Sequence, residues 1–63
     1  MQIRIKLHGA ISFDGSGDEI STPDYGCIVV RECSVAKYCY RLRSGESASF
    51  VYTDDSLEVR IDE

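Results

Sequence analysis

Strict alternation of apolar and polar residues at both ends of the chain is the feature that most constrains the fold. Aliphatic side chains occupy every second position from Gln2 to His8, and the same pattern returns from Leu57 to Asp62. A period of two residues is typical of a β-strand with one face buried and the other in water. The sequence therefore predicts a strand at each end of an antiparallel fold.

The length limits how large this fold can be. A chain of 63 residues buries only about 60% of the surface that its unfolded form exposes. Residues 1–63 are therefore expected to form a single small globular domain. Because no apolar run approaches the ~20 residues that cross a bilayer, no membrane association is expected. Three cysteines, an odd number, favour reduced thiols and a cytoplasmic location, which is the host-cell cytoplasm if a phage encodes the protein.

The pattern between residues 37 and 62 predicts a meander of three antiparallel strands. A three-residue loop at 44–46 places Tyr40 opposite Phe50, and a two-residue turn at 54–55 places Phe50 opposite Val59. Both registers gather the apolar side chains on one face. That face consists of Tyr38, Tyr40, Leu42, Ala48, Phe50, Tyr52, Leu57, Val59 and Ile61.

Residues 22–36 leave two interpretations open. The β-branched run at 27–30 favours a strand, whereas residues 22–24 have the composition of a helix start. We favour the strand because Gly26 costs a helix about 1 kcal/mol relative to alanine. The predicted fold class is thus all-β, an antiparallel barrel or sandwich of about five strands. The alternative is an α+β fold, an antiparallel sheet with one short helix near 22–36.

The net charge of −4 is distributed in bands. Residues 14–24 carry four acids and no base, residues 46–63 carry six acids and one arginine, and residues 25–45 are basic. The first acidic band is also rich in turn-forming residues, so a flexible acidic loop is predicted near 14–24. The overall acidity excludes a typical basic nucleic-acid module.

The acidic bands predict a binding protein. Anionic surfaces dock on basic sites and accelerate association. The leading hypothesis is a small acidic inhibitor or adaptor, and not an enzyme, that binds a basic surface of a larger protein or nucleoprotein complex, as nucleic-acid mimics do. A phage anti-defence inhibitor such as an anti-CRISPR is one concrete example, by analogy of size and charge. The candidate partner-binding acids are Asp14, Asp18, Glu19, Asp24, Asp54, Asp55 and Glu58.

The basic strand at 37–43 supports an alternative hypothesis. Its cations alternate with tyrosines, which is typical of surfaces that bind single-stranded nucleic acid. The strand period places the rings and the cations on opposite faces, so direct nucleic-acid binding is the less favoured function. In that alternative, a small β-barrel nucleic-acid-binding domain would use the basic patch Arg31, Lys37, Arg41 and Arg43.

No catalytic, cofactor or metal site is expected. His8 is the only histidine, and the sequence indicates no group that would orient it for catalysis. The cysteines Cys27, Cys33 and Cys39 lack the close pairs that zinc sites use, and they are interpreted as buried free thiols.

The two end strands also suggest a mode of assembly. At least one of them is expected at a sheet edge. An edge strand leaves backbone N–H and C=O groups unpaired, and another chain can bind them. A homodimer through such an edge is the expected form of self-association.

Overall fold

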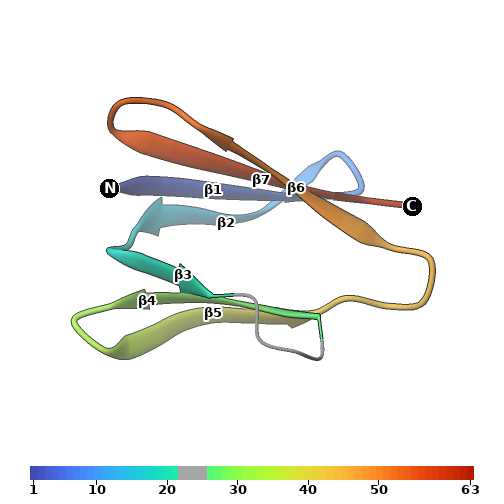
Figure 1. The fold of residues 1–63 in the computed structure, drawn as a ribbon, viewed down its shortest axis with the longest axis horizontal. Coiled ribbons are helices and arrows are strands. Elements are labelled where there is room, and N and C mark those ends of the chain that lie inside the picture. Colours follow the sequence, from blue (N-terminus) through green and yellow to red (C-terminus); the bar gives the residue numbers. More distant parts are fainter. Residues whose placement is uncertain (22–25) are drawn as a thin grey trace.

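The computed structural model describes residues 1–21 and 26–63, and within them the chain forms seven β-strands and no helix. The strands are β1 (Gln2–Leu7), β2 (Ala10–Ser16), β3 (Glu19–Ser21), β4 (Cys27–Glu32), β5 (Val35–Arg41), β6 (Ser47–Tyr52) and β7 (Ser56–Asp62). They build a four-stranded sheet in the order β2-β1-β7-β6 and a three-stranded sheet in the order β3-β4-β5. The two sheets face each other as layers (Figure 1).

The predicted fold class is confirmed, because the molecule is a small all-β sandwich. The described residues form seven strands where about five were expected, and their two sheets do not close into a barrel. The helix considered near 22–36 is replaced over residues 27–32 by β4. The β-branched side chains of this segment favour the strand over the helix, since Ile28 and Val30 are buried between the sheets. Residues 22–25 lie outside the described part.

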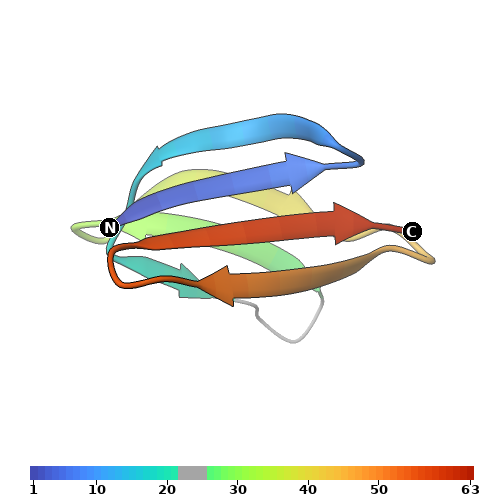
Figure 2. The same ribbon diagram turned by 90° about the horizontal axis from the view of Figure 1, so that it is seen from above.

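The first and last strands occupy the centre of the four-stranded sheet, side by side and parallel (Figure 2). Ile3 pairs with Leu57, and Ile5 pairs with Val59. Both segments are strands as predicted, but the expectation that one of them is an edge in an antiparallel sheet is wrong. Alternation determines which side chains face the core, and it does not determine which strand lies alongside.

The hairpin of β6 and β7 has the predicted register. Tyr52 faces Leu57, Phe50 faces Val59 and Ala48 faces Ile61. The N–H of Thr53 donates to the carbonyl of Ser56 at 2.9 Å, which closes the turn at residues 54–55. One exception concerns burial, because the side chain of Tyr52 lies beyond the core and is 64% exposed.

The predicted pairing of β5 with β6 is wrong. Strand β5 pairs with β4, where Tyr40 faces Ile28 and Tyr38 faces Val30. The connection over residues 42–46 carries the chain from the three-stranded sheet to the four-stranded sheet (Figure 1). A hairpin and a crossing between layers leave the same side chains facing the core, so the apolar pattern fits both.

The core lies between the two sheets and is aliphatic. Burying one such side chain contributes about 1.5–3 kcal/mol. At one side the ring centroids of Phe13 and Tyr38 lie 5.4 Å apart, and the hydroxyls of Ser12 and Tyr38 are 2.9 Å apart, so these contacts join β2 to β5. The fully buried residues are Ile3, Ile5, Ile28, Val30, Leu57, Val59 and Ile61.

The loop expected near 14–24 is largely replaced by strands. Residues 14–16 complete β2 and residues 19–21 form β3. Between them Gly17 turns the chain from one sheet to the other. A Cβ on Gly17 would lie 2.8 Å from Cδ1 of Ile3 and 2.9 Å from Cγ1 of Val30, so any other residue at this corner would force core side chains to move. Strand pairing thus outweighs the turn-forming composition of this segment.

Candidate functional site

One end of the sandwich gathers most of the predicted acidic residues. The β6–β7 turn, the β2–β3 corner and the β4–β5 turn all lie at the same end as the N-terminus (Figures 1 and 2). Two further acids lie on the outer face of the four-stranded sheet, each two residues from the strand terminus at this end. We define the acidic end as Asp14, Asp18, Glu19, Asp54, Asp55 and Glu58. The seventh predicted acid, Asp24, lies outside the described residues.

The β6–β7 turn forms the tip of the acidic end. The carbonyl of Asp55 accepts the N–H of Gln2 at 3.2 Å, which ties the turn to the start of β1. On the other side, the Thr53 hydroxyl bonds the carbonyl of Ser56 at 3.3 Å and also contacts its hydroxyl. The backbone of the turn is therefore held on both sides, while the residues Asp54 and Asp55 themselves are exposed.

Asp18 has a structural role as well as a charge. Its Oδ2 accepts the backbone N–H of Cys33 at 3.0 Å, and its own N–H donates to the carbonyl of Arg31 at 3.0 Å. Cys33 and Ser34 have φ values of 52° and 66°, in the left-handed region that side chains rarely adopt. The carboxylate thus stabilises a strained β4–β5 turn against the β2–β3 corner.

The other three acids of this end lie next to cations on neighbouring strands. Such half-exposed pairs stabilise a protein by only about 0–1 kcal/mol each. Their main effect is on charge, because pairing partly neutralises these three acids, whereas Asp54 and Asp55 have no ion pair among the described residues. The pairs are Arg4 with Asp14 at 3.3 Å, Lys6 with Glu58 at 3.8 Å and Arg31 with Glu19 at 3.9 Å.

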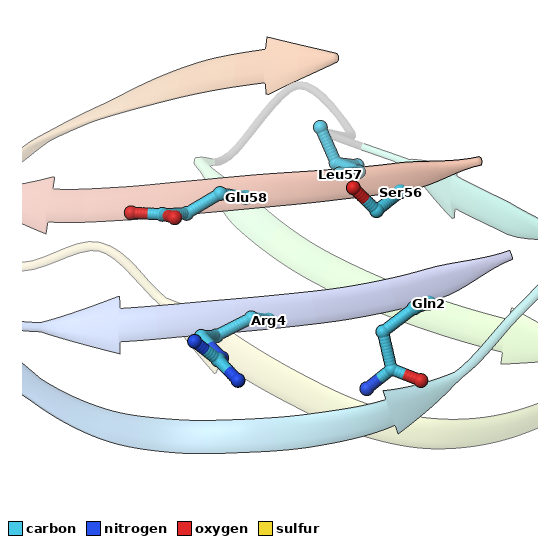
Figure 3. A pocket seen from close by; sticks show the side chains of 5 residues that line it. All are labelled: Gln2, Arg4, Ser56, Leu57 and Glu58. Carbon is cyan, nitrogen blue, oxygen red and sulfur yellow. The ribbon is translucent and has the colours of Figure 1, made fainter. Parts of the chain in front are cut away.

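An open pocket of about 220 Å³ lies on the outer face of the four-stranded sheet beside the tip (Figure 3). The polar side chains point outward from β1 and β7. Inside the pocket both signs of charge are present, and the cation is already bound, because the guanidinium of Arg4 lies 3.3 Å from Asp14. The arrangement suits polar contacts with a partner. The lining residues are Gln2, Arg4, Ser56, Leu57 and Glu58.

The four predicted basic residues do not form one patch. Arg31 donates to Ser21 at 3.1 Å near the acidic end, and the Lys37 ammonium lies 2.9 Å from Glu32. That ammonium lowers the pKa of the Glu32 carboxyl. In contrast, Arg41 faces Cys27 at the opposite end of β4, and Arg43 lies in the crossing from β5 to β6. The basic band is therefore divided between the two ends of the molecule.

His8 has an orienting carboxylate that the sequence did not reveal. Its Nε2 lies 2.5 Å from Oε2 of Glu46. The other carboxylate oxygen, Oε1, accepts the backbone N–H of Arg43 and the hydroxyl of Tyr40, both at 2.7 Å. These donors, with the Arg43 N–H the strongest, lower the pKa of Glu46 to about 2, and the same carboxylate raises the pKa of Tyr40.

The Glu46 carboxylate joins the two sheets. Its side chain is only 4% exposed, whereas that of His8 is 43% exposed. It connects the β1–β2 turn to the crossing that leads into β6. Among the described residues, no serine or cysteine is hydrogen-bonded to His8. We therefore interpret the His8–Glu46 contact as one that stabilises the packing of the two sheets. The two residues are 38 positions apart, and no local pattern could have linked them.

The expectation that the cysteines are buried is wrong for two of them. Cys33 and Cys39 are exposed, and Cys27 is partly buried. Ile28 and Val30 occupy the core-facing positions of β4, which leaves Cys27 and Cys39 on the outer face of the three-stranded sheet. In the part of the chain that the structure describes, no three metal-ligating side chains come together.

Comparison with protein families, curated proteins and solved structures finds no match to this chain. Within the described residues, no helix is long and apolar enough to cross a membrane. The class that the fold and surface define is a small all-β sandwich with an acidic end.

Proposed function

We propose that this protein is a small, non-enzymatic, cytoplasmic binding protein whose acidic end docks on a basic site of a larger protein or nucleoprotein complex. The observation that carries the proposal is the β6–β7 turn, where Asp54 and Asp55 are exposed at the tip of the molecule while the backbone beneath them is held by Gln2 and Ser56. An inhibitor of a nucleic-acid-binding complex, such as a phage anti-defence protein, would use this chemistry.

Preorganisation supports this role for the turn. A loop that is already ordered loses little conformational freedom on binding, so more of its interaction energy appears as affinity. The two adjacent carboxylates would accept hydrogen bonds from arginine or lysine side chains of the partner. The remaining negative charge of the end would accelerate encounter with a basic surface, and this acceleration would diminish in salt.

The test uses a synthetic peptide of arginine and lysine residues as the probe. Binding at low ionic strength is followed by amide chemical shifts, which we expect to change most around residues 53–56. The variant D54N/D55N should weaken binding roughly two- to thirtyfold, since each exposed ion pair contributes about 0.2–1 kcal/mol. The matched control is D62N/E63Q, which removes the same charge at the other end of β7 and should retain affinity.

The proposal fails if both double variants lose affinity equally, because binding would then depend only on net charge. A second experiment addresses the natural partner. Affinity capture from source cells is performed with the wild type, D54N/D55N and D62N/E63Q as baits. We expect a basic protein or nucleoprotein to be retained by the first and third baits and lost by the second.

A second candidate function is direct nucleic-acid binding through Arg41 and Arg43. One observation favours it, namely that neither guanidinium lies within 4 Å of a carboxylate among the described residues. Gel shifts at low salt test it. Binding that the charge reversal R41E/R43E abolishes, and that D54N/D55N leaves unchanged, would favour this function over the acidic docking surface.

A further inference from the structure

In the part of the chain that the structure describes, four strands lie at sheet edges, and β6 is the least protected of them. It contains no charged residue, no glycine and no proline, and its pairing with β7 runs without a register shift. The other edges are blunted in ways that proteins commonly use. Strand β2 carries Asp14 and an irregularity, β5 carries two cations and an irregularity, and β3 has only three residues.

Among the described residues, the backbone of β6 presents a regular row of groups with no strand partner on one side. Antiparallel strands alternate between residue pairs that exchange hydrogen bonds and pairs that do not. Because Thr53 donates to Ser56 in the closing pair, the odd-numbered residues of β6 are those that bond β7. The N–H and C=O groups of Ala48, Phe50 and Tyr52 are consequently directed at the free edge.

We propose that β6 pairs antiparallel with β6 of a second copy of this chain, with Phe50 at the two-fold axis. Phe50 then exchanges both backbone hydrogen bonds with Phe50 of the partner subunit. Ala48 does the same with Tyr52 of the partner subunit, so every outward group of the strand is satisfied. The pairing joins two four-stranded sheets into one continuous sheet of eight strands.

The side chains fit this register on both faces of the joined sheet. Tyr52 and Val51 are exposed apolar residues, at 64% and 53%. On the core-facing side, Tyr52 lies opposite the small Ala48 of the partner subunit. On the outer side, Val51 lies opposite Ser49 of the partner subunit. Residues that face each other across antiparallel strands contact through their side chains, so both exposed groups become partly covered.

A second copy can pair with this edge without bringing like charges together at the contact. The whole chain carries a net charge of −4, and two copies would repel each other through most of their surfaces. Strand β6 brings no charge to the contact, and Glu46 at its start is only 4% exposed and already bound by His8. A strand that meets itself about a two-fold axis needs only this self-complementarity.

Two matched double variants test the pairing and its register by sedimentation equilibrium over a range of concentrations. In S49E/V51E, each new carboxylate faces another across the two-fold axis, and we expect the dimer dissociation constant to increase about tenfold or more. In S49E/V51K, a carboxylate faces an ammonium instead, and the dimer should persist. Within one chain, Ser49 lies opposite Arg60 and Val51 opposite Glu58, so S49E/V51K should also fold well.

A third variant, A48P, probes the backbone directly. The N–H of Ala48 is directed away from β7, so proline there spares the hairpin and blocks the edge. We expect a folded monomer, with circular dichroism reporting the fold. The proposal is overturned if the wild type sediments as a monomer at all concentrations, if S49E/V51E dimerises as the wild type does, or if S49E/V51K dissociates as readily as S49E/V51E.

Discussion

The imidazole of His8 lies 2.5 Å from the carboxylate of Glu46, although the two residues belong to turns that follow strands of different sheets. The carboxylate also accepts hydrogen bonds from Tyr40 and from the backbone of Arg43. One nearly buried side chain therefore joins the start of β6 to both layers of the sandwich.

Substitution of this carboxylate should destabilise the fold. E46Q keeps the size of the side chain but removes the charge that its donors bind, and we expect the melting temperature at neutral pH to fall by about 5 °C or more. Thermal unfolding followed by circular dichroism measures the change. E63Q, which removes the exposed side-chain carboxylate of Glu63, serves as the control and should melt as the wild type does.

The same carboxylate predicts how stability depends on pH. The pKa of Glu46 is lowered from an ordinary 4.5 to about 2 in the folded protein. A lowered pKa stabilises the folded state above the unfolded value and loses that stabilisation as pH falls through the folded value. We expect the wild type to lose stability between about pH 4.5 and pH 2. Urea unfolding across this window should show a smaller loss for E46Q, and equal losses would contradict the assignment.

A side chain at Gly17 should destabilise the fold. An alanine Cβ at this position would meet Cδ1 of Ile3 at 2.8 Å and Cγ1 of Val30 at 2.9 Å. Relief of this overlap requires core side chains to move, which typically costs about 1–3 kcal/mol. Urea unfolding of G17A measures the cost. S49A on an exposed strand position is the comparison and should change stability by less than about 0.5 kcal/mol.

Truncation of a buried and of an exposed isoleucine should reduce stability by different amounts. Ile5 is 0% exposed and Ile11 is 57% exposed. Truncation of a buried isoleucine leaves a cavity, so I5A should reduce the free energy of unfolding by about 2–5 kcal/mol. I11A should reduce it by less than about 1 kcal/mol. Similar losses in the two variants would mean that Ile11 is also packed against the core.

The thiols should react in the order of their exposure. Cys33 and Cys39 are exposed and Cys27 is partly buried. Under native conditions, we expect a thiol-labelling reagent to modify the first two faster than the third. Mass spectrometry of peptides after a short reaction gives the three rates. Equal rates in urea would show that the difference comes from the fold.

The sequence predicts those parts of the fold that depend on side-chain period alone. It identifies β1 and β7 as strands, the register between Phe50 and Val59, and the apolar face of β5. Which strands are neighbours could not be predicted, because the parallel pairing of β1 with β7 and the passage of β5 into the other sheet join segments that are distant in the chain. Such pairings satisfy the same alternation as the hairpins that were expected.

The candidate site was predictable to a similar extent. The turn at Asp54 and Asp55 follows from the hairpin register, which is local. The ion pair of Arg4 with Asp14 depends on the register of the β1–β2 hairpin, which was not predicted. The partner of Glu58 was not predictable, since Lys6 comes beside it only when β1 and β7, from opposite ends of the chain, pair. The contact of Glu46 with His8 could not be predicted either, because the two residues are distant in sequence.

The parallel contact between β1 and β7 also constrains how the chain folds. The contact joins the first strand to the last, so its loop-closure entropy must be overcome before its buried isoleucines stabilise anything. The hairpins β1–β2, β4–β5 and β6–β7 can each form early, because their partners are adjacent in sequence. Strand β1 has one open side until β7 pairs with it, so the four-stranded sheet is complete only once these two distant segments have come together.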